Sequence, residues 1–200
     1  MSGIIAQNSG RHTGLVKASS GGDAVWNLIL TQTASSSATI DFTSEIDSTY
    51  DEYVFKFINI HPQTDGVHFT FQGNAAGGSG YNETMTTTDF YAYQSEGGTT
   101  AFAYYEGGDQ AQGTAFQRIC TEADNDNDSC VSGFMYLYAP SSTTFVKHFM
   151  TRVNYHHNNV ASRDEYIAGY FNTTSAIDEI QFKMSSGDID SGTISLYGIT

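Results

Sequence analysis

Basic residues are scarce in this chain of 200 residues, which carries 8 Lys and Arg side chains against 22 Asp and Glu and has a formal net charge of −14. The resulting field repels phosphate, and no run of Lys or Arg is interleaved with aromatic residues. We therefore expect neither nucleic acid nor an anionic membrane surface as a partner. Partners that are neutral, cationic or reached through metal ions remain.

Long apolar runs are also missing. No segment reaches the roughly 18 to 20 apolar residues that a membrane-spanning helix needs, so we expect no membrane insertion. The opening MSGIIAQNSGRHTG has no basic stretch followed by a long apolar run, so it does not encode a classical secretion signal. Charged residues make up 15% and hydrophobic residues 39%, which excludes a charge-rich disordered chain. The sequence predicts one folded domain of ordinary size.

Helical periodicity is almost absent, and period-two alternation takes its place. Alternating apolar stretches are typical of strands with at least one buried face. They lie at 53–60, 67–71, 90–93, 134–138, 145–150, 180–184 and 194–197. Glycine-rich or polar segments separate them, as in GNAAGGSG and HPQTDG, and favour turns. We therefore predict an all-β protein: an antiparallel β-sandwich or jelly roll.

The first 35 residues differ from the rest, with glycines and hydroxyl residues around a few apolar side chains. Such a segment buries too little apolar area to fold alone, and it orders only against its own domain or a neighbouring subunit. We predict an extended N-terminal arm at residues 1–35 and a compact domain at residues 36–200.

Cys120 and Cys130 are the only cysteines, and they flank the polar stretch TEADNDNDS. If Cys120 ends one strand and Cys130 begins the next, the two side chains face each other across a hairpin and form a disulfide in an oxidising medium. Two half-buried free thiols are the alternative, which we favour because disulfides are rare in proteins that fold in the cytosol.

Four segments carry a resemblance to a known class of proteins. They are the opening GIIAQNSGRHTGLVKA and residues 48–73, 140–150 and 168–199, with the strings TYDEY-x-F-x-F-x-NI-x-P and GTI-x-LYGI. In these strings the chain resembles virion structural proteins of tailed phages of marine bacteria, including cyanophages. The resemblance implies a place on the virion surface and brings no catalytic residues with it.

The function that this resemblance implies is that of a virion surface protein, made in the host bacterial cytoplasm. We expect a tail-fibre or appendage component in host attachment, assembled as a homotrimer and joined to other virion proteins through its N-terminal arm. A capsid decoration protein that reinforces the lattice is the first alternative, and a glycan-cleaving enzyme is the second.

The acidic run 124–128 is a candidate calcium loop. Asp124, Asp126 and Asp128 place carboxylates at i, i+2 and i+4, a spacing at which a loop can wrap Ca²⁺. An EF-hand loop starting at Asp124 would need Gly at position 129 and Glu at position 135, where this chain has Ser129 and Met135. We therefore favour a solvated acidic hairpin tip, with calcium as the alternative and no other cofactor expected.

Catalytic motifs are absent from the sequence. Adjacent acidic pairs such as Asp164 with Glu165 occur as in any acidic β domain, and no nucleophile elbow, HExxH or Walker loop is present. His156 and His157 are neighbours, so on a strand they point to opposite faces and do not chelate one metal together. We expect the protein not to be an enzyme.

Aromatic residues crowd the segment 81–105, and strand alternation cannot bury all of them. Tyr104 and Tyr105 must point to opposite faces, whereas Tyr91 and Tyr93 share a face. Exposed tyrosine rings near amides and carboxylates serve sugar stacking as well as protein interfaces. We predict that Tyr91, Tyr93, Tyr104 and Tyr105 contact a host surface glycan or a neighbouring subunit, and intersubunit or core packing is the interpretation that we favour.

Overall fold

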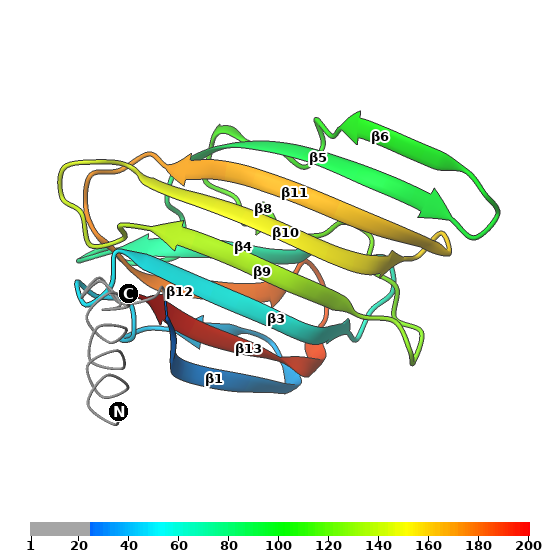
Figure 1. Cartoon of the computed structure of the whole chain (residues 1–200), viewed down its shortest axis with the longest axis horizontal. Coiled ribbons are helices and arrows are strands. Elements are labelled where there is room, and N and C mark those ends of the chain that lie inside the picture. Colours follow the sequence, from blue (N-terminus) through cyan, green and yellow to red (C-terminus); the bar gives the residue numbers. More distant parts are fainter. Residues whose placement is uncertain (1–24) are drawn as a thin grey trace, which may run out of the picture.

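The predicted alternation forms thirteen β-strands in residues 25–200, the part of the chain that the computed structural model describes. Two antiparallel sheets pack face to face, which confirms the predicted all-β sandwich (Figure 1). Within residues 25–200 there is no helix, and hence none long and apolar enough to cross a membrane.

The large sheet has nine strands, and eight of them lie side by side across the front of Figure 1. All of its neighbouring strands are antiparallel, so each strand turns alternate side chains to the two faces. In spatial order the strands are β1 (Trp26–Ser37), β13 (Ile189–Ile199), β3 (Glu52–Pro62), β9 (Val131–Tyr138), β10 (Lys147–His157), β11 (Ala161–Phe171), β5 (Met85–Ser95) and β6 (Thr100–Tyr104), and β7 (Ala111–Gly113) also pairs with β5.

The small sheet lies behind the large one and has four strands. Their order is β2 (Ile40–Phe42), β12 (Ile177–Met184), β4 (Phe69–Ala75) and β8 (Gln117–Arg118). β2 and β8 are only three and two residues long, so the small sheet is much narrower than the large one.

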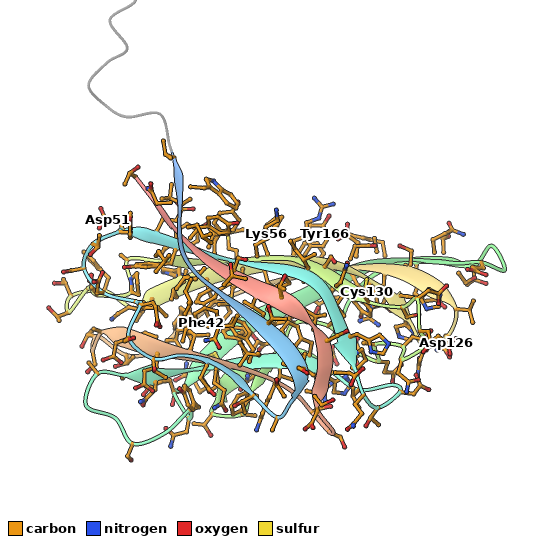
Figure 2. The ribbon with its side chains drawn as sticks, turned by 90° about the horizontal axis from the view of Figure 1, so that it is seen from below. Phe42, Asp51, Lys56, Asp126, Cys130 and Tyr166 are labelled. Carbon is orange, nitrogen blue, oxygen red and sulfur yellow. The ribbon has the colours of Figure 1, made fainter. Side chains whose placement is uncertain are left out.

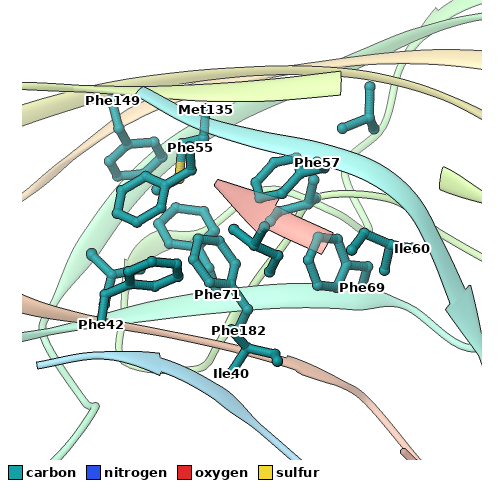
Figure 3. Packing of buried hydrophobic residues seen from close by; sticks show 14 of the residues in the cluster. Ile40, Phe42, Phe55, Phe57, Ile60, Phe69, Phe71, Met135, Phe149 and Phe182 are labelled. Carbon is teal, nitrogen blue, oxygen red and sulfur yellow. The ribbon is translucent and has the colours of Figure 1, made fainter. Parts of the chain in front are cut away.

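Phenylalanine rings fill the space between the two sheets (Figure 3). Phe182 of β12 is fully buried at the centre, and five other rings lie with centroids 5.2 to 6.4 Å from its own. Those rings belong to Phe42, Phe55, Phe57, Phe69 and Phe71. Most of these pairs meet edge to face, the arrangement that the ring quadrupole favours. Phe55 and Phe57 of β3 are therefore held by Phe182 of the opposite sheet.

The predicted boundary between arm and domain is wrong for residues 26–35, because these residues form most of strand β1. β1 pairs with β13 from Trp26 to Ser37, and Ala34 is buried in the core. The Gln32 side-chain amide donates to the backbone carbonyl of Asp41 at the start of the small sheet. Backbone pairing to β13 orders this segment, and Ile29 and Leu30 pack against the core. Residues 1–24 of the expected arm lie outside the described residues.

Replacing Phe182 by Ala should lower the free energy of unfolding by about 3 to 5 kcal/mol, because the change opens a cavity among five rings. Urea denaturation followed by tyrosine and tryptophan fluorescence measures the loss. The matched control is Phe102→Ala, whose side chain is 75% exposed, and it should change stability by no more than about 0.5 kcal/mol. Equal losses in both variants would contradict the assigned core.

A chain that begins at residue 36 should be less stable than one that begins at residue 25. Removing residues 25–35 uncovers the β13 edge and takes Ala34 out of the core, and an uncovered edge strand also promotes aggregation. Thermal unfolding and light scattering of the two chains provide the comparison. Identical melting curves and equal solubility would show that β1 is not an integral strand.

Candidate functional site

The large sheet turns one face to the small sheet and the other face to solvent, and we call the second the outer face. Figure 2 shows Lys56 and Tyr166 on that side, away from Phe42 in the interior. Cross-strand pairing and ring contacts place ten aromatic side chains on the outer face. They are Trp26, Phe90, Phe102, Tyr104, Phe134, Tyr136, Tyr138, Tyr166, Tyr170 and Tyr197. Isolated exposed aromatics are ordinary, but ten on one sheet face make this face the candidate binding surface.

One row of side chains, which we call the aromatic ridge, crosses five strands of the outer face. It consists of Phe134, Arg152, Tyr166, Phe90 and Tyr104, each directly opposite the next in the strand register. The rings of Tyr166 and Phe90 are parallel, with centroids 4.9 Å apart and planes at 2°. The Arg152 guanidinium lies 4.9 Å from the centre of the Tyr166 ring. Stacking thus fixes the middle of the ridge.

A parallel row of small and polar side chains lies beside the ridge, and we call it the polar trough. Asn154 is opposite Ser132 and Asp164, and Asp164 is opposite Ala92. Ser162 and Gln94, which face each other in the next row, complete it. Two hollows, of about 330 and 280 Å³, are lined by Asn154, Asp164 and their neighbours. The trough side chains are shorter than those of the neighbouring ridge, which leaves this space open.

Hydrogen bonds hold the polar trough side chains in place. Arg152 donates from Nε to Oδ1 of Asp164 (3.2 Å) and from Nη2 to Oδ2 (2.8 Å), and the Tyr166 hydroxyl donates to Oδ2 (3.0 Å). The Nδ2 of Asn154 donates to Ser162 Oγ (3.0 Å) and to the carbonyl of Arg163 (3.1 Å). The hydrogen bond to Asp164 also raises the pKa of Arg152. Arg152 and Asp164 therefore cancel each other's charge.

A third hollow, of about 450 Å³, lies on the other side of the ridge. Ala168 leaves the space, and larger side chains from neighbouring strands surround it. They include Thr88, Tyr138, His148, Met150 and Tyr170. This hollow lacks the amide and carboxylate groups of the polar trough.

Three of the four tyrosines predicted to contact a glycan or a subunit lie on the inner face. Arg163 places its guanidinium 3.8 Å from the centre of the Tyr91 ring and 5.1 Å from that of Tyr105. Tyr93 packs edge to face against His157. Only Tyr104 lies on the outer face, as the partner of Phe90, and its side chain is exposed. Tyr91, Tyr93 and Tyr105 therefore pack within the domain, in agreement with the interpretation favoured from the sequence, and their contact with a glycan or a subunit stays a prediction.

Sequence analysis missed the main residues of the site, namely Phe134, Arg152, Asn154, Asp164 and Tyr166. The signal was present in part, because Phe134 begins the alternating stretch FMYLY. Alternation separates two faces of a strand but does not say which face a second sheet covers. The strand order β9-β10-β11-β5 then unites side chains that are up to 76 positions apart in the sequence (Phe90 to Tyr166).

A buried ionic cluster lies on the inner face at the other side of these same strands. Glu165 is fully buried and accepts hydrogen bonds from Arg163 Nη2 (3.1 Å) and the Tyr155 hydroxyl (2.5 Å). Asp89 is also fully buried, and no described residue donates a hydrogen bond to either of its oxygens. Burial raises the pKa of Glu165, and burial followed by repulsion from Glu165 raises that of Asp89 to about 8. A proton on Asp89 makes it a donor toward Glu165, so the two carboxyls and Arg163 become neutral together.

The three aspartates of the candidate calcium loop do not come together around one point. Burial alone would raise the pKa of Asp124, but hydrogen bonds from Ser129, the Asp126 backbone and His156 lower it. Asp126 and Asp128 are exposed. In residues 25–200 no group of three or more His, Cys, Asp or Glu side chains is arranged to hold a metal. Calcium binding stays a prediction.

Both cysteines are free thiols in the structure. Cys120 is buried after β8 of the small sheet, where its Sγ accepts a hydrogen bond from the Phe69 backbone (3.4 Å), and burial raises the pKa of its thiol. Cys130 precedes β9 of the large sheet and contacts Asn59. The hairpin that would pair the two cysteines as a disulfide is not formed, because the strands that flank them belong to different sheets.

The chain was compared with models of protein families, with curated proteins and with solved structures, and no match was found in any of the three.

The buried carboxyl pair should make stability fall as pH rises. The folded state keeps a proton on Asp89 up to a pKa of about 8, whereas the unfolded chain releases it near pH 4, so the free energy of unfolding decreases between these limits. The slope is at most about 1.4 kcal/mol per pH unit. Asp89→Asn, which needs no proton, should gain stability relative to the native chain between pH 5 and pH 8 in urea titrations.

The exposed variant Asp65→Asn controls for the loss of one negative charge. Its stability should follow that of the native chain across the same pH range. An Asp89→Asn curve that also ran parallel to the native curve would show that Asp89 is ionised in the folded protein.

Proposed function

We propose that this protein is a virion surface structural protein of a tailed phage of marine bacteria, acting as a tail-fibre or appendage component in host attachment. The observation that carries the proposal is the outer face of the large sheet, which carries ten exposed or half-buried aromatic side chains beside a polar trough. A sheet face of this composition is a recognition surface. The likeness of residues 48–73 and 168–199 to phage virion proteins supports the setting.

The charge of the protein suits that setting. At −14 the molecules repel one another at low ionic strength, but in seawater the screening length shrinks to a few Å, roughly 3 to 4 Å. The charge then costs little within an assembly and still opposes aggregation. We include in the proposal a homotrimeric assembly that joins other virion proteins through the N-terminal segment.

Attachment is tested with antibodies and with the soluble protein. Gold-labelled antibody against residues 25–200 should mark the tail or its appendages on phage particles, and added soluble protein should reduce adsorption of the phage to its host. Sedimentation of the purified full chain should give the mass of three copies.

Antibody label spread over the phage head, at the copy number of the capsid lattice, would contradict the attachment function. It would favour the alternative of a capsid decoration protein. Particles that contain no copy of the chain would contradict the virion assignment altogether.

A further inference from the structure

We infer that the polar trough binds a neutral, pyranose-containing polysaccharide, with sugar rings packed against the aromatic ridge. This inference rests on the proposed attachment function and names its ligand class. The site comprises Asn154, Ser162, Asp164 and Gln94 along the trough, flanked by Phe134 and Tyr166 of the ridge.

The arrangement of apolar and polar groups matches the two sides of a sugar ring. A pyranose presents hydrogens bound to carbon on one face and hydroxyl groups around its edge, so it needs a flat apolar surface beside a row of donors and acceptors. The Tyr166 ring is stacked on Phe90 on one side and covered by Arg152 on the other, so Phe134 and the edges of the stacked rings supply the apolar surface. Asn154 Oδ1 and the Asp164 carboxylate supply acceptors, and the Gln94 amide supplies an acceptor and a donor. Such a mixture of aromatic walls and few polar groups is typical of small-molecule sites.

The trough is longer than one sugar. It runs across β9, β10, β11 and β5, from Ser132 to Ala92. Neighbouring strands are about 4.8 Å apart, so these three intervals span roughly 14 Å. The two hollows within it, of about 330 and 280 Å³, share Asn154 and Asp164 as lining residues. The site therefore suits consecutive residues of a chain rather than a single monosaccharide.

The charges in the trough favour a neutral ligand. Arg152 is already bound to Asp164 by two hydrogen bonds, so Asp164 neutralises the positive charge that would attract a sulfate or a uronic acid. Asp164 and the overall charge of −14 repel anions. Hydroxyl groups, by contrast, can hydrogen-bond to Asp164 without displacing Arg152.

A second copy of the chain fits the trough less well. Packing two outer faces together would bury the Arg152–Asp164 pair and the amide of Asn154, and burying charged and amide groups is costly unless each finds a new partner. The cores of stable protein interfaces are depleted of charged residues for this reason. The glycan keeps these groups hydrogen-bonded, which is why we assign it as the occupant.

Internal bonds preorganise the site. The side chains of Arg152, Asp164 and Tyr166 are fixed by three hydrogen bonds, and both amide hydrogens of Asn154 are engaged, which leaves its Oδ1 as an acceptor for the ligand. Groups already held in one geometry lose less rotamer entropy when a ligand binds.

The test is a two-dimensional ¹H–¹⁵N NMR titration of the full chain with glucose, galactose, mannose and N-acetylglucosamine, combined with an array of neutral and sulfated oligosaccharides. The side-chain amide signals of Asn154 and Gln94 should shift with neutral sugars, and neutral oligosaccharides should bind on the array. Asn154→Ala and Tyr166→Ala should each weaken binding about tenfold.

The matched controls lie on the same strands and the same face but across the ridge. His148→Ala on β10 controls for Asn154→Ala, and Tyr170→Ala on β11 controls for Tyr166→Ala. Both controls should bind as the native chain does. Melting temperatures of all four variants verify that they are folded. If Tyr166→Ala unfolds, the comparison of sugar binding by Asn154→Ala and His148→Ala decides whether the trough is the binding site.

Three results would overturn the inference. The first is that neither amide signal shifts and no neutral glycan binds on the array, and the second is that the protein prefers sulfated glycans. The third is that the signals shift when the protein concentration alone is raised, which would identify a second copy as the occupant. Antibody labelling of particles is independent of these measurements. A chain that marks the phage tail without binding neutral sugars would leave the attachment function standing and remove only the ligand assigned here.

Discussion

The unequal width of the two sheets is the constraint on which the rest of the structure depends. Nine strands face four, and two of those four are only two or three residues long. The rings of Phe55, Phe57 and Phe149 on the large sheet meet Phe182, Phe69 and Phe71 of the small one. Strand β5 has no such partner in the small sheet. Its inner side is covered by the segment that leads from β6 to β9.

That covering segment accounts for the polar interior at this end of the sandwich. Thr87 of β5 hydrogen-bonds to Gln117, Gly108 lies so close to Asp89 that an added Cβ would clash with its carboxylate, and Thr121 donates toward Glu165. A loop brings unpaired backbone groups with it, and polar side chains on the sheet satisfy them better than apolar ones. Asp89 receives no donor from a described residue, and burial together with repulsion from Glu165 holds it as the neutral acid.

Much of the fold was accessible from the sequence, because alternation in stretches such as 53–60 and 134–138 reports strands directly. The site was not, because it depends on strand order. Tyr91 and Tyr104 look alike in the sequence, yet one packs on buried Arg163 and the other faces solvent beside Phe90. The same limit applies to β1, whose serines and threonines resemble an arm until backbone pairing to β13 is known.

An arginine–carboxylate pair lies on each face of β10 and β11, and the two pairs are in opposite environments. On the inner face, Arg163 and Glu165 are buried, so the cluster excludes water and a nearby carboxyl stays protonated. On the outer face, Arg152 and Asp164 are accessible, with side chains 52% and 24% exposed, and they form a charge-neutral pair that still has hydrogen-bonding capacity. Because water screens the outer pair, its worth to stability is small. Its geometry instead orders the side chains around the trough, which is the contribution that a binding surface requires.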